Sequence, residues 1–263
     1  MYKTPYPYKP KTVMITGATG DFGKAFCTRF AAIGSKLILV ARNEDKARAL
    51  ETEIKERFPQ VQIHLSVFDI TEKQAMYDAY QSLPEDFQDI DLLINNAGLA
   101  LGLEPSYACD IEDWETMVMV NNMALIRMSR LVLEGMEQRK AGHIINIGSI
   151  SGNYPYPGGN VYCATKAFVK QFSLAIRGDL KGTNIRVTNI EPGAVETQFS
   201  EVRFKGDKER ANSVYANTKN IYAEDVGETV FWAATLPEHV NINRLEVMAT
   251  VQSFGPNPIE RFD

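Results

Sequence analysis

Seven short apolar runs recur along the chain, and most of them are continuous rather than alternating. Continuous runs are typical of strands that are buried on both faces, which means a parallel sheet with helical crossovers. The runs lie at Thr12 to Thr16, Lys36 to Ala41, Val61 to Val67, Ile90 to Asn95, His143 to Gly148, Ile185 to Ile190 and Leu245 to Ala249. We therefore expect seven parallel strands.

The segments between these runs carry apolar residues three and four positions apart, which is the spacing of amphipathic helices. They are EDKARALETEIKERF, DWETMVMVNNMALIRMSRLVLEGMEQR, YCATKAFVKQFSLAIRGDL and AEDVGETVFWAATL. Alternating strands and helices predict an α/β fold of the Rossmann type, a doubly wound seven-stranded parallel sheet flanked by helices. In such a sheet ligands bind outside the carboxyl ends of the strands.

The composition agrees with one domain. The chain has 263 residues, of which 44% are hydrophobic and 23% charged, enough for one substantial core. Residues 1–11, MYKTPYPYKPK, contain no apolar core of a secretory signal and are expected to form a partly ordered surface arm. Residues 12–263 are expected to form a single domain.

Charge and cysteine usage exclude several classes of partner. The net charge of -5 and the lack of clustered Lys and Arg argue against nucleic acid, and no apolar run is long enough to span a membrane. The three cysteines, Cys27, Cys109 and Cys163, are far apart, so we expect no metal site, no disulfide and a cytoplasmic location. Cys163 is close to the catalytic candidates below, but a small buried residue is its simpler interpretation.

The stretch TGATGDFG, from Thr16 to Gly23, follows the first run and precedes a predicted helix. Its glycines suit a tight turn, close backbone approach and helix packing, and the helix N-terminus can bind a diphosphate. A plain structural turn is the alternative. The cofactor-binding candidates here are Gly17, Thr19, Gly20, Phe22 and Gly23. Asp21 is expected to turn away from the diphosphate, toward solvent or the first helical turn, where an acid is favourable.

The ends of the second and third runs carry the adenosine candidates. Arg42 stands where an acid would bind a ribose 2'-hydroxyl, so it favours NADP over NAD, unless it only solvates the strand end. Asn43 can add a hydrogen bond. Asp69 can hold the adenine amino group, or it can cap the helix that begins near Thr71.

The fourth run ends in INNAG, where the candidates for cofactor binding are Asn95 and Ala97. The amides can satisfy loop backbone groups, and Gly98 lets a cofactor approach closely. Stabilisation of the sheet is the alternative role of this segment, and both roles can hold together.

Ser149 follows the fifth run, and Tyr162 and Lys166 come 13 and 17 residues later. Four residues apart, Tyr162 and Lys166 share one face of a helix. A free tyrosine has a pKa of about 10, and a nearby ammonium lowers it. Tyr162 can then exchange a proton with a substrate oxygen that Ser149 holds, while hydride moves to or from a nicotinamide.

Together, the glycine turn, Asp69, NNAG, the Ser-Tyr-Lys set and PGAVET resemble the short-chain dehydrogenase/reductase family over about residues 11–253. The resemblance implies that Ser149 orients the substrate, Tyr162 is the acid/base and Lys166 binds the nicotinamide ribose. It also implies that Asn121, seven residues after Trp114, holds a water that relays protons, although Asn122 is adjacent. Near the nicotinamide it implies Pro192, Gly193, Val195 and Thr197.

Longer stretches such as NNAGLALGLEP and HIINIGSISG are similar to the NADP-dependent 3-hydroxy acid dehydrogenases of this family. That similarity implies NADP(H), a small 3-hydroxy acid of the serine, allo-threonine or 3-hydroxypropionate type, and a homotetramer. It also places a substrate lid at about residues 194–222. There Arg203 can pair with a substrate carboxylate and Lys205 can add a charge, unless both only solvate a loop.

One motif departs from the compact branch of the family, whose turn reads T-G-x-x-x-G-x-G and requires glycine at position 21. This chain reads T-G-x-x-G-x-x-G, as in the extended branch, which puts the cofactor affinity in doubt rather than the reaction class. A broad carbonyl or 3-oxoacyl reductase is the alternative function. A non-catalytic NADP-binding sensor is a remote alternative, because Ser149, Tyr162 and Lys166 are all present.

Overall fold

A computed structural model describes residues 8–216 and 218–254. Its seven strands form one parallel sheet in the order β3-β2-β1-β4-β5-β6-β7, so the predicted doubly wound single-domain fold is confirmed. The strands are β1 (Thr12–Thr16), β2 (Lys36–Ala41), β3 (Ile63–Val67), β4 (Leu92–Asn95), β5 (Gly142–Ile147), β6 (Ile185–Pro192) and β7 (Arg244–Val247). β1, β4, β5 and β6 are buried along their whole length, which suits the mainly apolar sequence of β4. β6 is buried as well although it carries the polar residues Arg186, Thr188, Asn189 and Glu191.

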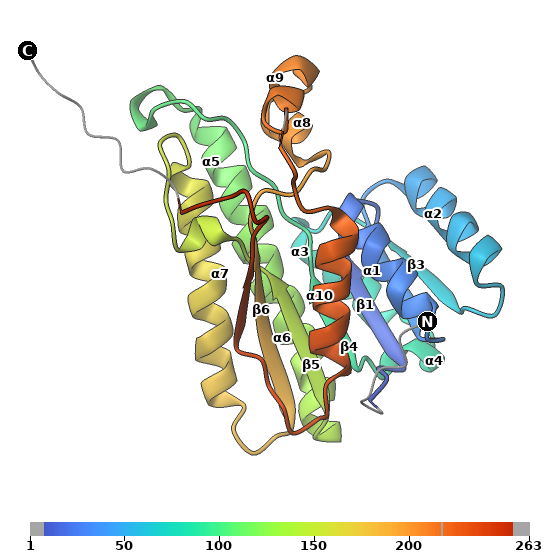
Figure 1. Cartoon of the computed structure of the whole chain (residues 1–263). Helices are drawn as coiled ribbons and strands as arrows, with labels where there is room; N and C mark the ends of the chain where they lie inside the picture. Colours follow the sequence, from blue (N-terminus) through green and yellow to red (C-terminus); the bar gives the residue numbers. More distant parts are fainter. Residues whose placement is uncertain (1–7, 217, 255–263) are drawn as a thin grey trace, which may run out of the picture.

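Helices cover both faces of the sheet. Those packed on one face are α1 (Asp21–Ala31), α2 (Glu44–Arg57) and α10 (Ala223–Thr235). Those packed on the other are α3 (Lys73–Gln81), α4 (Glu85–Gln88), α6 (Ala124–Arg139) and α7 (Asn160–Asp179). Figure 1 shows α1 and α10 side by side, and Phe30 of α1 packs there against Phe231 of α10 at a centroid distance of 5.6 Å.

The remaining elements surround the carboxyl ends of the strands. They are the 3-10 turns η1 (Ser106–Ala108) and η3 (Ile150–Gly152), α5 (Ile111–Val118), the π-helical turn η2 (Met119–Met123), α8 (Phe199–Arg203) and α9 (Lys208–Ser213). In Figure 1, α8 and α9 rise above one end of the sheet. They lie within the segment predicted as a lid, of which residue 217 is outside the described residues.

The end of the predicted N-terminal arm is attached to the sheet, while residues 1–7 lie outside the described residues. The Ser35 hydroxyl donates to the Pro10 carbonyl at 2.6 Å, and the Lys11 amide donates to Asp91 at 2.7 Å. In the described part of the chain, no helix is long and apolar enough to cross a membrane.

His143 is buried in β5, where its Nε2 lies 2.8 Å from the Thr188 hydroxyl. Burial, with a further contribution from Arg186, holds the pKa of His143 well below its ordinary value. Below a pH of about 6.5 the unfolded chain therefore binds a proton that the folded chain does not, and folding becomes less favourable as the pH falls.

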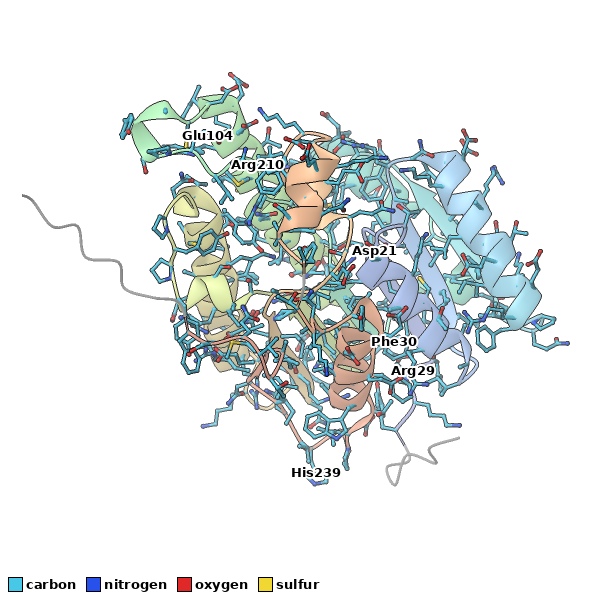
Figure 2. All side chains as sticks on the ribbon, turned by 45° about the horizontal axis from the view of Figure 1, so that its top comes forward. Asp21, Arg29, Phe30, Glu104, Arg210 and His239 are labelled. Atoms are coloured by element: carbon cyan, nitrogen blue, oxygen red, sulfur yellow. The ribbon has the colours of Figure 1, made fainter. Side chains whose placement is uncertain are left out.

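We expect this histidine to contribute up to about 1.4 kcal/mol of lost unfolding free energy for each pH unit below 6.5. Urea unfolding of the protein and of His143→Asn, between pH 7 and 5, measures the contribution as a shallower pH dependence in the variant. His239→Asn is the control, because His239 is exposed, at the end of the molecule away from the lid in Figure 2. Equal pH dependence in both variants would contradict the assignment.

Candidate active site

A cleft of about 1210 Å³ opens at the carboxyl ends of the strands. Most of the predicted site residues line it: Gly17, Thr19, Gly20, Phe22, Arg42, Asp69, Ala97, Ser149, Tyr162, Lys166, Pro192, Gly193, Val195, Thr197 and Arg203. Three predicted residues, Gly23, Asn95 and Asn121, do not line it. The cleft therefore brings nearly all of the candidates together, and the other three lie outside its lining.

The glycine turn joins β1 to α1. Gly17 has a φ of +63°, and a Cβ there would meet the Ala97 Cα at 3.1 Å. A Cβ on Gly23 would lie only 2.4 Å from the Gly17 carbonyl oxygen, so Gly23 allows α1 to pack on the turn rather than contacting a ligand. Gly20 precedes α1 without a side-chain cap, which leaves first-turn N–H groups available for a diphosphate.

Asp21 is the first residue of α1 and lines the cleft. Among the described residues, its side chain forms no hydrogen bond with the first helical turn, one of the two expected directions, and that it turns away from the diphosphate stays a prediction. Its Oδ2 instead accepts a hydrogen bond of 2.8 Å from the Gln198 backbone N–H, at the start of α8. No local sequence pattern signals this contact, because every residue other than proline offers an N–H group.

The adenosine candidates lie at the ends of β2 and β3. The Arg42 side chain is 83% exposed and its Nη1 lies 3.8 Å from Asp69 Oδ2, so its other donors remain accessible from the cleft. Asp69 also accepts hydrogen bonds from the Thr71 amide and hydroxyl, so it caps the following turn while lining the cleft. Asn43 caps α2 by accepting from the Lys46 amide at 2.9 Å.

The two amides at the end of β4 make different contacts. Asn95 is 3% exposed and donates to Ser129 and Asn146, so it stabilises the sheet and is not placed to contact a cofactor. Asn96, which the sequence analysis did not select, lines the cleft and donates to the carbonyl groups of Thr16 and Gly17. Both amides thus stabilise the structure around them, and only Asn96 also lines the cleft.

Ser149, Tyr162 and Lys166 converge on the cleft from the end of β5 and the first turns of α7. Tyr162 and Lys166 lie one turn apart on the same face, and both are buried. The Lys166 ammonium donates to the Ile147 carbonyl at 2.8 Å and lies 5.9 Å from the centre of the Tyr162 ring. The Ser149 hydroxyl donates to Ser151 Oγ at 3.0 Å.

Burial governs the acid–base state of this group. It raises the pKa of Tyr162 above its ordinary value, and the Arg203 guanidinium and Ser149 hydroxyl oppose this rise. The expected lowering of the Tyr162 pKa by Lys166 is therefore not found in the protein alone. Burial also lowers the pKa of Lys166 to about 8. Tyr162 is thus a protonated phenol at neutral pH. Lys166 can lose a proton at a pH slightly above neutral.

Asn121 lies in the π-helical turn η2 rather than in a regular helix, which the apolar spacing did not predict. Its side chain accepts from the Leu99 amide at 2.9 Å and donates to the Leu99 carbonyl at 2.9 Å. The Asn121 Oδ1 and Lys166 Nζ both lie within 3.5 Å of the position that a Cβ on Gly98 would occupy. The absence of a side chain at Gly98 therefore lets Asn121 and Lys166 both lie close to this loop.

The segment after β6 forms another wall of the cleft. A Cβ on Gly193 would collide with Gln252 Oε1, which accepts a hydrogen bond of 2.9 Å from the Ala194 amide. Gln252 also lines the cleft, although no motif in the sequence indicates it. The Thr197 hydroxyl accepts from the Phe199 amide at 3.3 Å, so it orders the chain that enters α8.

Arg203, at the end of α8, lies against the ring of Tyr162. Its guanidinium carbon is 5.1 Å from the Tyr162 ring centre, and its Nη2 donates to the Tyr156 hydroxyl at 2.6 Å. Within residues 8–216 and 218–254, no acceptor binds its buried Nε. Lys205 is not part of this group, because it lies outside the cleft lining and forms a salt bridge of 2.8 Å with Asp113.

The sequence matches the short chain dehydrogenase family over residues 11–208. An NADP-dependent 3-hydroxy acid dehydrogenase of Salmonella typhi is 51% identical over 250 residues, which cover 95% of this chain and 99% of that protein. Sulfoacetaldehyde reductase 2 of Chromohalobacter salexigens is 44% identical, with 95% and 98% covered. A solved structure, the closed form of serine dehydrogenase complexed with NADP+, matches with a TM-score of 0.91 at 48% identity and covers 95% of this chain and 100% of that one. The resemblance found in the motifs is confirmed, and this chain belongs to the short-chain dehydrogenase family.

Proposed function

We propose that the protein is an NADP-dependent oxidoreductase that transfers hydride between the nicotinamide and C3 of a small 3-hydroxy acid or its 3-oxo product. The observation that carries the proposal is the position of Arg203 beside Tyr162 in the cleft that Ser149 and Lys166 also line. A cation there can hold the carboxylate of a short substrate while its hydroxyl meets the catalytic group. The relatives named above support the cofactor and the class of substrate.

The proposed mechanism uses the protonation state of each group. The nicotinamide, when bound, supplies or accepts hydride. In reduction the Tyr162 phenol donates its proton to the substrate oxygen, which the Ser149 hydroxyl orients by a hydrogen bond. Lys166, whose pKa of about 8 permits proton exchange near neutral pH, then returns a proton to Tyr162.

A substrate panel tests this function. Serine, allo-threonine and 3-hydroxypropionate are assayed in oxidation with NADP+ and with NAD+, and a 3-oxoacyl thioester and sulfoacetaldehyde are assayed in reduction with NADPH and with NADH. We expect the highest kcat/KM with a 3-hydroxy acid and NADP. Preference for the thioester would favour the broad carbonyl or 3-oxoacyl reductase, and binding of NADPH without turnover of any substrate would favour the sensor.

We expect Arg42→Ala to raise the KM for NADP by about tenfold and the KM for NAD by less than twofold. The reason is that the exposed guanidinium can pair with the 2'-phosphate, which NAD lacks. Steady-state kinetics with both cofactors measures the two values. Arg48→Ala is a matched control on the same surface, because Arg48 is paired with Glu44 of its own helix. Equal increases for both cofactors would reject the role of Arg42.

The assembly and the location are part of the same proposal. A homotetramer is supported by apolar side chains left exposed on α5 and α7, with Val118 at 42% and Phe168 at 43%. Light scattering after size exclusion tests it. A cytoplasmic location is supported by the three cysteines, all of which are free thiols.

A further inference from the structure

Asp21 joins two segments that are 177 positions apart. It stands directly after the glycine turn, and its Oδ2 accepts the 2.8 Å hydrogen bond from the Gln198 backbone N–H. Figure 2 shows Asp21 at the end of α1 that faces the segment carrying α8 and α9. The side chain therefore leaves the turn and attaches to the segment that covers the site.

The attached residue, Gln198, immediately precedes α8. Because α8 has only five residues, a hydrogen bond to the residue that precedes it holds the start of the helix and constrains where the helix lies. Two of them contact the catalytic tyrosine: the Phe199 ring centre lies 5.7 Å from that of Tyr162, and the Arg203 guanidinium carbon lies 5.1 Å from it. Asp21 is thus connected, through Gln198 and α8, to Phe199 and Arg203 beside Tyr162.

The segment that carries α8 and α9 is also attached to the chain around the start of α5. The Gly102 amide donates to the Arg203 carbonyl at 3.0 Å, and Lys205 pairs with Asp113 at 2.8 Å. Glu104 and Arg210, labelled in Figure 2, form a longer ion pair of 4.0 Å on the same side. These contacts tie α8 and α9 to the segment before and within α5, whereas Asp21 ties them to the glycine turn.

We propose that Asp21 is a positioning residue that couples the dinucleotide-binding turn to the lid, and so sets the placement of Phe199 and Arg203 over Tyr162. This role explains a carboxylate next to the predicted diphosphate site, because its charge is directed to a backbone donor of the lid. The expected effect of Asp21 on substrate binding rests on the function proposed above. The contact between Asp21 and the lid does not depend on that function.

Tryptic cleavage of the lid tests the contact without any substrate. Lys205, Lys208 and Arg210 are exposed, so loosening of the segment should accelerate cleavage there. We expect Asp21→Ala to increase the cleavage rate by about tenfold, and Asp21→Asn, which keeps an acceptor oxygen without the charge, to increase it by less. Glu224→Ala is the control, because it removes an exposed carboxylate from the first turn of α10 instead.

Kinetics and binding then test the positioning role. We expect Asp21→Ala to raise the KM for the 3-hydroxy acid by about tenfold, with a smaller change in kcat, a dissociation constant for NADPH within twofold of the original, and partial recovery in Asp21→Asn. An unchanged cleavage rate in Asp21→Ala would overturn the inference whatever the substrate is. A KM increase matched by an equal loss of NADPH affinity would overturn it as well, because Asp21 would then act on the cofactor alone.

Discussion

Tyr162→Phe is expected to lower kcat by about a thousandfold while NADPH still binds, because general acid–base catalysis contributes about this much. The substitution removes one hydroxyl and keeps the ring. The packing of the ring on Phe199, at 5.7 Å between centres, and beneath Arg203 is therefore retained. Steady-state kinetics with an oxo acid and a fluorescence titration with NADPH measure the two quantities separately.

The reduction direction suits this measurement, because Tyr162, whose pKa burial raises above its ordinary value, is protonated at neutral pH and the protonated phenol is the form that reduction requires. Tyr107→Phe is the control, since Tyr107 is 92% exposed and lies outside the cleft lining. Retained turnover in Tyr162→Phe would refute the assigned acid. Loss of NADPH binding together with turnover would instead indicate that the hydroxyl supports the cofactor site.

The parts of the fold that the sequence predicted are those with a repeating local signal. The strand at Thr12 to Thr16 is apolar throughout because helices cover both of its faces, and this burial can be inferred from composition alone. The grouping of Ser149, Tyr162 and Lys166 could also be predicted from the sequence, since the helical period places Tyr162 and Lys166 on one face.

The parts that it missed depend on contacts between distant segments. The contact of Asp21 with Gln198 involves a backbone donor, which carries no side-chain signature. The raised pKa of Tyr162 reflects how completely the fold buries it, and spacing from Lys166 does not encode burial. Lys205 looked equivalent to Arg203 in the sequence, but the fold pairs it with Asp113.

Arg203 is the residue that should decide selectivity for acids. We expect Arg203→Leu to raise the KM for a 3-hydroxy acid by about a hundredfold, because it removes a charge-assisted pair from a largely buried position beside the reacting group. Arg203→Lys keeps the charge without the planar fork, so we expect an intermediate increase of about tenfold. Lys205→Ala should leave the KM unchanged, since Lys205 is engaged by Asp113 outside the cleft.

An uncharged substrate separates carboxylate binding from a general effect on the site. Arg203 also contributes to lowering the pKa of Tyr162 and packs on Tyr156 and Phe199, so its removal can affect turnover of any substrate. If Arg203 binds the carboxylate, Arg203→Leu reduces kcat/KM for 3-hydroxypropionate far more than for 1,3-propanediol, which lacks the acid group. Equal reductions for both substrates would mean that Arg203 supports the tyrosine and the lid but does not recognise the acid.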